Sequence, residues 1–310
     1  FRENGKKFFK HQSYFAMGLD LADINNDGMI DIFEVEMLPK ERKRSIMNMG
    51  SMNPQLFEEL GRLGFVPQYM RNSLQLNRAR GQFSDIAQIA NVGKTDWSWG
   101  TLLVDIDDDG YKDIFVTNGI VNDIKDRDFA RRGNKLSEKS GGSLTLEQHL
   151  DLVVSTRVPN YAFQNQQNGL FEDKSKEWGF ADKGFSNGFS YADLDNDGDL
   201  DLIVNNINES PWIYKNNSRE RGSNTINFKL KGTTKNRNGI GSKVKIYTDG
   251  EMQYAEQYVV RGFISSSQHI IHFGLGNKSE IDSLEIIWPD RKVERINTPL
   301  KANKTYTLDQ

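Results

Sequence analysis

One nine-residue pattern, D-x-[DN]-x-D-G-x-x-D, occurs three times and constrains the fold of this chain more than any other feature. Asp loop 1 covers residues 23–31, Asp loop 2 residues 105–113 and Asp loop 3 residues 193–201. A hard cation such as Ca²⁺ takes about six to eight oxygen ligands, which positions 1, 3, 5, 7 and 9 of a tight loop can supply. The glycine at position 6 permits the positive φ that folds such a loop. A single copy could be an ordinary Asp- and Gly-rich turn, but three copies favour calcium loops.

The pattern assigns a ligand set to each loop. Side-chain oxygens at positions 1, 3, 5 and 9 are predicted from Asp23, Asn25, Asp27 and Asp31, from Asp105, Asp107, Asp109 and Asp113, and from Asp193, Asp195, Asp197 and Asp201. Backbone carbonyls at position 7 are predicted from Met29, Tyr111 and Asp199. Asn25 removes a charge, so Asp loop 1 is the weakest of the two to three predicted sites. The β-branched and aromatic segments after the loops, such as "DIFEV", predict strand-loop-strand sites rather than EF-hands.

A second pattern, N-x3-G-x-F-x-D, repeats together with the loops. It begins at Asn77 and Asn165, which are 88 residues apart, and Asp105 and Asp193 have the same separation. Asn216 stands at the corresponding place after Asp loop 3. Two motifs that move together indicate a duplicated unit, and without its inserts this unit has the length of a four-stranded propeller blade.

The first two units carry inserts with helical signals. Asn53 and Pro54 form a helix start signal, while Thr145 and Gln148 form a capping-box pattern. The inserts are expected to protrude from one end of the propeller, where they either cover the blade edges or bind a partner. The charged run "KERKR" at residues 40–44 is expected to be a solvated turn rather than a partner site.

Composition excludes several classes of protein. Lys and Arg total 40 against 43 Asp and Glu, and a net charge of -3 gives no field suited to nucleic acid or an anionic membrane. No run of about 18 apolar residues predicts a membrane-spanning helix, and Cys is absent. The chain begins "FRENGKKFF", without Met or a signal-peptide pattern, and three blades are fewer than the about four to eight of a closed ring. We therefore expect a processed or partial chain.

Histidine and tryptophan have ordinary structural interpretations. His269 and His272 lie three apart in a predicted strand and face opposite sides, which places them on the rim of a small sheet rather than on one metal. Trp97, Trp99 and Trp178 could form a sugar-stacking platform, although packing between blades is favoured.

Residues 1–218 resemble the FG-GAP/VCBS repeat family of propeller blades, found in integrin α heads and in many secreted bacterial proteins. The resemblance rests on the Asp loops, on "GLDLAD", "GTLLVD" and "GFSYAD" before them, and on the N-x3-G-x-F-x-D strands. It implies that the calcium ions are structural and tie the strands of one blade together.

Residues 219–310 lack Asp loops and alternate short strands with Gly, Asn and Asp turns, which predicts a small, sandwich-like β domain. "NGIGSKVKIYT", "RGFISSSQ", "HFGLG" and "IDSLEIIWPD" resemble the ASPIC/UnbV domain that follows such blades in cartilage acidic proteins and in large surface proteins of Bacteroidetes-type bacteria. Where that domain usually continues with glycine after Asp290, this chain has Arg291, which leaves the geometry of the turn open.

The expected fold is all-β: propeller blades with calcium-binding Asp loops and helical inserts, then the C-terminal β domain. The preferred function is a non-catalytic, calcium-stabilised binding or scaffold module, secreted or on a cell surface, that engages a protein or glycan through its loops. The bacterial resemblance implies a lipoprotein of the outer-membrane surface, associated with TonB-dependent nutrient transporters. One alternative is a calcium-dependent polysaccharide lyase or hydrolase, which needs a basic residue and a Tyr or His converging with an aspartate. Another is a structural segment of a larger surface protein.

Overall fold

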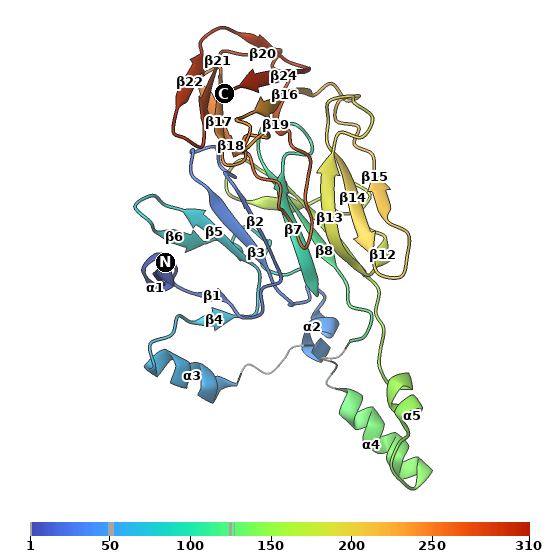
Figure 1. Ribbon diagram of the computed structural model, residues 1–310. Coiled ribbons are helices and arrows are strands. Elements are labelled where there is room, and N and C mark those ends of the chain that lie inside the picture. Colours follow the sequence, from blue (N-terminus) through green and yellow to red (C-terminus); the bar gives the residue numbers. More distant parts are fainter. Residues whose placement is uncertain (1, 49–52, 124–125, 127) are drawn as a thin grey trace.

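The computed structural model describes residues 2–48, 53–123, 126 and 128–310, and most of its regular structure is β-strand (Figure 1). Three small antiparallel sheets stand side by side in a propeller-like arrangement. A separate β domain covers one end of these sheets, and helices lie at the opposite end. The predicted all-β fold class is confirmed.

Each of the three sheets is built around one Asp loop, which connects its first two strands. Sheet 1 contains β2 (Gly18–Ala22), β3 (Asp31–Val35), β5 (Ser73–Asn77) and β6 (Phe83–Asp85); sheet 2 contains β7 (Ser98–Val104), β8 (Asp113–Asn118), β10 (Tyr161–Asn165) and β11 (Phe171–Asp173); sheet 3 contains β13 (Ser186–Ala192), β14 (Asp201–Asn206) and β15 (Trp212–Tyr214). Strands β2, β7 and β13 are neighbours across the sheets and form their inner face. The predicted blades are therefore present, with three described strands in the last one.

The cores between the sheets follow from strand alternation. In β3, Asp31, Phe33 and Val35 are buried on one side, while Ile32 and Glu34 are only half-buried. One apolar core joins sheets 1 and 2, and a second joins sheets 2 and 3. The sheets consequently pack through large apolar side chains, as blades of a propeller do.

Two of the three tryptophans singled out in the sequence contribute to packing. Trp178 stacks on Phe115 with ring centroids 6.0 Å apart, and Trp99 contacts Phe263 of the C-terminal domain at 5.1 Å. Trp99 also donates its indole N–H to the Gly119 carbonyl at 2.5 Å. Trp178 therefore packs against the core between sheets 2 and 3, as favoured, whereas Trp99 packs against the C-terminal domain rather than between blades.

The inserts form the helices that the sequence predicted, and two more. Helix α3 (Pro54–Arg62) is capped by Asn53, and α5 (Leu146–Asp151) begins with a complete capping box formed by Thr145 and Gln148. Helices α2 (Arg42–Asn48) and α4 (Asp128–Ser140) had no recognised start signal. Short elements complete this part of the chain: α1 (Gly5–Phe8), β1 (Gln12–Ser13), β4 (Gln68–Tyr69), β9 (Val158–Pro159) and β12 (Lys183–Gly184).

The solvated-turn interpretation of residues 40–44 is wrong for Arg44. Its guanidinium pairs with Asp96 and with Asp123, both at 2.8 Å, and all three side chains are largely buried. Lys40 also pairs with Asp173 at 2.5 Å. No local signal in the sequence indicated these partners, because they lie far along the chain. Through these pairs, Arg44 fastens the first insert to the segments beside sheet 2.

The C-terminal domain contains two main sheets around a separate core that includes Phe228, Phe273 and Trp288. One sheet contains β16 (Asn224–Lys231), β19 (Ile271–Gly276) and β24 (Lys304–Asp309); the other contains β17 (Lys243–Thr248), β18 (Glu251–Glu256), β21 (Ser283–Ile287) and β22 (Val293–Ile296); β20 (Glu280–Ile281) pairs with β23 (Leu300–Lys301). Arg291 has φ +72°, a conformation that glycine adopts without strain, so the turn after Asp290 keeps a left-handed residue.

Candidate metal centres

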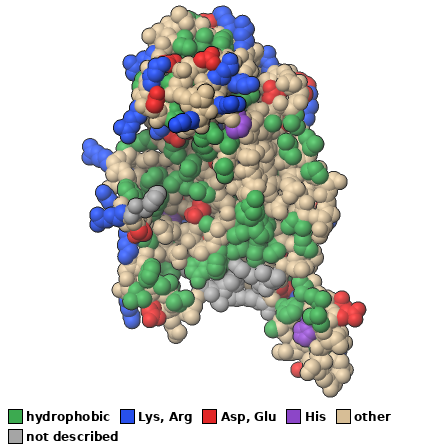
Figure 2. Space-filling model, viewed as in Figure 1, with side chains coloured by type: hydrophobic (Ala, Val, Ile, Leu, Met, Phe, Trp, Pro, Cys, Tyr) green, Lys and Arg blue, Asp and Glu red, His purple; other side chains and the backbone are tan. Residues whose placement is uncertain are grey.

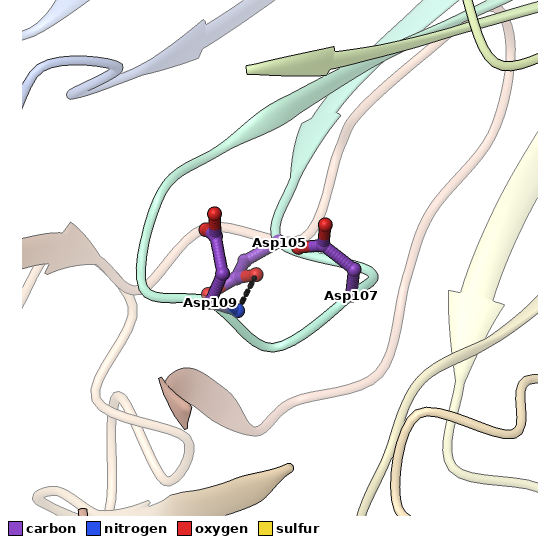
Figure 3. A group of neighbouring side chains, drawn as sticks. All are labelled: Asp105, Asp107 and Asp109. Carbon is purple, nitrogen blue, oxygen red and sulfur yellow. Dashed lines mark hydrogen bonds between the residues drawn. The ribbon is translucent and has the colours of Figure 1, made fainter. Parts of the chain in front are cut away.

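Asp loop 2 gathers three carboxylates at the turn between β7 and β8. Ligand oxygens of Asp105, Asp107 and Asp109 lie within 4.8 Å of one another (Figure 3). The corresponding residues of Asp loop 3 are similarly close: Asp193, Asp195 and Asp197. Positions 1, 3 and 5 of the predicted ligand sets therefore converge in these two loops.

The backbone of each loop folds around the position 1 carboxylate. Asp105 accepts hydrogen bonds from the Asp109 N–H at 3.1 Å and the Gly110 N–H at 2.9 Å. In Asp loop 1, Asp23 accepts in the same way from the Gly28 N–H at 2.7 Å. Gly110 has φ +98°, which explains the glycine at position 6.

The position 9 aspartates have a further structural role. Both oxygens of Asp113 accept backbone N–H groups, one from Ile106 at 3.2 Å and one from Asn165 at 2.9 Å. Asp31 and Asp201 make the equivalent bonds in their own loops. These aspartates connect the loop to the third strand of the sheet, and only their remaining lone pairs could reach an ion. Ligation by these residues, and by the carbonyls of Met29, Tyr111 and Asp199, stays a prediction.

The electrostatics of Asp loop 2 favour a bound cation. Burial raises the pKa of Asp105 and Asp113 well above the ordinary value, and it raises the pKa of Asp107 to about 6. Neighbouring aspartates raise these pKa values further. One buried oxygen of Asp107 and one of Asp193 have no hydrogen-bond partner among the described residues. A divalent cation would neutralise the clustered charge and satisfy these oxygens, so the residues present fit Ca²⁺.

The three loops differ in how freely they could take an ion. In Asp loop 1, the Asn25 amide donates to Asp27 at 3.0 Å and so turns its nitrogen toward the site. In Asp loop 3, Lys215 pairs with Asp195 at 2.8 Å and lowers the pKa of that carboxyl. Within the described part of the chain, no ion pair engages Asp105, Asp107 or Asp109, which makes Asp loop 2 the strongest candidate.

The C-terminal domain lies directly on the Asp loops. In Asp loop 2, the Gly274 N–H donates to Asp105 at 3.2 Å and the Gly276 N–H to the Asp108 carbonyl at 2.7 Å. Thr225 donates to the Gly198 carbonyl of Asp loop 3 at 3.1 Å. A side chain on Gly28 of Asp loop 1 would meet Met252 at 3.0 Å. All three loops are thus in contact with this domain.

His272 is not on the rim of a sheet, as the sequence suggested, but buried between the two domains. One ring nitrogen lies 2.7 Å from Asp108, and the other lies 2.9 Å from the Asn227 side-chain oxygen. Asp108 also accepts a hydrogen bond from Ser218. The strand prediction for His272 holds; the rim placement is wrong because the sequence does not show that the domain docks through this strand.

A second contact between the domains lies at the inner face of the sheets. Arg261, in the loop between β18 and β19, approaches both oxygens of Asp20 at 3.1 and 2.8 Å. It also donates to the Leu103 carbonyl at 2.9 Å and to the Tyr191 hydroxyl at 2.8 Å. Since these partners lie on β2, β7 and β13, one buried side chain contacts the first strand of every sheet.

Sequence reasoning did not identify Asp20 or Asp108 as functional. Asp20 had a detectable signal, because it occupies the same buried face of β2 as Gly18 and Ala22, where a charged residue needs a partner. Asp108 is at position 4 of Asp loop 2, which supplies no ligand in the pattern. Its role depends on the docked C-terminal domain, where it contacts His272.

Comparisons with known proteins agree with this organisation. Residues 64–116 and 148–204 match the family model described as FG-GAP-like repeat, and residues 232–310 match the one described as ASPIC and UnbV. The first repeat match begins just after α3 and ends in β8, so it contains Asp loop 2. The second begins in α5 and ends in β14, so it contains Asp loop 3. The chain therefore carries FG-GAP-like repeats followed by an ASPIC and UnbV domain, as predicted.

Among individual proteins, the chain is 27% identical over 254 residues to cartilage acidic protein 1 of Homo sapiens. The match covers 72% of this chain and 38% of that protein, so the chain spans well under two thirds of its relative. No helix in the described residues is long and apolar enough to cross a membrane. Together, the propeller repeats and the C-terminal domain indicate a surface or secreted binding module.

Proposed function

We propose that this chain is a non-catalytic, calcium-stabilised binding module that engages another protein through the end of the propeller that carries helices α2 to α5. We name this end the insert end. The observation that carries the proposal is the concentration of exposed apolar side chains there. We further propose that two to three calcium ions are structural.

The apolar side chains of the insert end come from two separate inserts. In the first insert, Leu63 is 68% exposed and Phe65 60% exposed; in the second, Leu146 is 77% and Leu150 61% exposed. Figure 2 shows hydrophobic side chains gathering over this end of the molecule. Exposed apolar side chains grouped on each insert in this way are typical of protein interaction sites.

The other end of the sheets is not available to a partner. The C-terminal domain contacts all three Asp loops there, through the bonds from Gly274 and Thr225 and through Met252 beside Gly28. The loop that carries Arg261 fills the space along the inner strands. The insert end is therefore the free end, which supports its role in binding.

The enzyme alternative requires a basic residue and a Tyr or His converging with an aspartate, and Arg261, Tyr191 and Asp20 do converge. Their polar atoms, however, are bonded to one another. The two cavities beside them measure about 40 and 30 Å³. Substrate sites span about 300 to 1,000 Å³, so this cluster supports docking rather than catalysis.

For the location, we propose an extracellular protein, and by the bacterial resemblance an outer-membrane surface lipoprotein. The partner class proposed on the same ground is a TonB-dependent nutrient transporter. This assignment rests on analogy with surface proteins that share the domain combination.

Site-specific photocrosslinking in cells that produce the protein tests the proposal. A photoreactive amino acid at Leu63 or Leu150 should give an adduct of the same mass with one protein. Val293, which is 49% exposed on the C-terminal domain, is the matched control and should give none. Absence of adducts at both insert positions, or an equal adduct at the control, would contradict a binding role for the insert end.

A further inference from the structure

Sheet 3 ends at β15, whereas sheets 1 and 2 each continue with a fourth strand. In sheet 1, β6 pairs antiparallel with β5, and in sheet 2, β11 pairs in the same way with β10. Among the described residues, β15 pairs with β14 alone, because the chain after Asn216 turns toward β16 of the C-terminal domain. Figure 1 shows β15 at the outer edge of its sheet. Sheet 3 therefore has an open edge where the other two sheets have a further strand.

In sheets 1 and 2, the fourth strand and the turn after it satisfy the outward backbone groups of the third strand. The Ala162 N–H of β10 donates to the Ser175 hydroxyl at 3.0 Å, and the Ala162 carbonyl accepts from the Lys174 N–H at 2.9 Å. In β5, the Leu74 N–H donates to Asp85 at 3.1 Å. These bonds show what the corresponding edge of sheet 3 lacks.

Ile213 is the counterpart of Ala162 in β15. It stands three positions before Asn216, as Ala162 stands before Asn165, and both asparagine N–H groups donate to the position 9 aspartate of their loop. In the described part of the chain, neither backbone group of Ile213 has a partner beyond β14. A row of unpaired backbone groups on an edge strand is a template for a further strand.

The side chains of β15 are not those of a strand that ends a sheet. Natural edge strands are protected by charged side chains, and the outer strands β6 and β11 have the sequences "FSD" and "FED". The sequence of β15 is "WIY", without a charge, and Ile213 is 65% exposed. Aromatic and β-branched residues favour strand pairing. The composition of β15 is therefore that of a strand with a neighbour on both sides.

The groove beside this edge also leaves room for a fourth strand. Between sheets 1 and 2, the Phe171 N–H of β11 donates to the Ala90 carbonyl at 3.2 Å, and the Phe171 side chain is buried. Trp178 stands 88 positions after Ala90, and among the described residues its carbonyl has no donor. A cavity of about 320 Å³ borders Trp178, Lys215 and Asn216, and its lining is both polar and apolar. A strand added to β15 would thus find a free acceptor and space for one side chain.

We propose that the open edge of sheet 3 binds an extended segment of another protein, which adds to β15 as an antiparallel fourth strand. The other two sheets indicate the register, because Phe171 lies opposite Asn165 and Phe83 lies opposite Asn77. The bound segment would therefore place an aromatic residue opposite Asn216. An aspartate follows two positions later in both outer strands, so the partner segment has the pattern F-x-D.

Nuclear magnetic resonance of the intact protein in saturating calcium tests this proposal. The probe is the synthetic peptide NGLFEDKSK, which has the sequence of residues 168–176 and contains the F-x-D pattern. The peptide should slow hydrogen exchange of the Ile213 amide, because strand addition pairs that group. Replacing the phenylalanine of the peptide by aspartate should weaken binding by about tenfold or more, because it removes the one large apolar side chain that enters the groove.

Two variants at one position separate the backbone from the side chain. Ile213→Pro removes the outward N–H and should weaken peptide binding about tenfold, the size of one lost hydrogen bond. Its melting temperature should stay close to that of the wild type, because an edge strand accepts proline where the N–H faces solvent. Ile213→Thr keeps the N–H and a β-branched side chain, so this matched control should bind the peptide as the wild type does.

Unchanged exchange at Ile213 in the wild type, or unchanged binding in Ile213→Pro, would overturn the site. The exchange measurement needs no variant, so it decides the question even where Ile213→Pro does not fold. A wild-type dimer that Ile213→Pro abolishes would assign the edge to a second copy and overturn a separate partner. Crosslinking at Leu63 or Leu150 does not involve β15, so failure of the proposed function and failure of this site are distinguishable.

Discussion

The contact between Arg261 and Asp20 predicts that the C-terminal domain stabilises the whole set of sheets. The perturbation is Arg261→Met, which keeps most of the apolar length of the side chain and removes the guanidinium. Asp20 then keeps one of the described bonds, from the Leu103 N–H at 2.7 Å, while its side chain remains 1% exposed. The variant therefore leaves a buried carboxylate without its counter-charge.

The expected loss in the free energy of unfolding is large for a single substitution. Removing one partner of a buried ion pair costs about 3 to 5 kcal/mol, because the other charge stays desolvated. That is a substantial part of the about 5 to 15 kcal/mol that stabilises an ordinary folded protein. The matched control is Arg295→Met: its pair with Glu285, at 2.7 Å, involves an Arg side chain that is 67% exposed. An exposed pair is worth about 0 to 1 kcal/mol.

Urea unfolding in saturating calcium, followed by tryptophan fluorescence, measures both variants. Adding Asp20→Asn to Arg261→Met should recover part of the lost free energy of unfolding, because it removes the unpaired charge. The losses in the two single variants should therefore not be additive. A loss in Arg261→Met no larger than in the control, or additive losses in the double variant, would refute a stabilising pair at the inner face.

Three further outcomes are expected. Calcium at one hundred times its Kd should raise the free energy of unfolding by about 2.7 kcal/mol per site, and calorimetry that finds no change in melting temperature on chelation would show that the Asp loops are ordinary turns. Burial raises the pKa of Asp107 to about 6 and that of Asp31 to about 7, so the ion-free folded protein holds protons that the unfolded chain releases near pH 4. The free energy of unfolding of the chelated protein should therefore fall as pH rises through 6 to 7. The calcium-induced shift in melting temperature should accordingly be larger at pH 7.5 than at pH 5.5. An equal shift at both pH values would contradict the raised pKa values. Gly274→Ala should weaken docking of the C-terminal domain, because its Cβ would clash with Asp105, whereas Gly61→Ala, with nothing within 4 Å, should not; hydrogen exchange in β19 compares them.

The sequence predicted those parts of the fold whose cause is local. The Asp loops depend on residues within nine positions of one another, and the capping box of α5 depends on Thr145 and Gln148, three positions apart. Because these local patterns repeat along the chain, they also predicted one sheet for each Asp loop. Converging carboxylates in Asp loops 2 and 3 follow from the same short spacing.

The parts that the sequence did not predict depend on partners far apart in the chain. Arg44 and its aspartates, or Arg261 and Asp20, are joined only in the folded protein. A charged residue on the buried face of a strand shows that a partner is required, but it does not say which one. The buried position of His272 was missed for the same reason, because it depends on how two domains dock.

The contacts of the C-terminal domain give the Asp loops a role that reaches beyond single blades. Gly274 donates to Asp105, a predicted ligand, so the same carboxylate belongs to the ion site and to the interface. An ion that orders Asp105 would favour the docked domain, and linkage requires that docking favours ion binding by the same free energy. The domain in turn holds the inner strands through Arg261. Ion binding, domain docking and sheet packing should therefore be lost together in one cooperative transition, rather than in separate steps for the sheets and the domain.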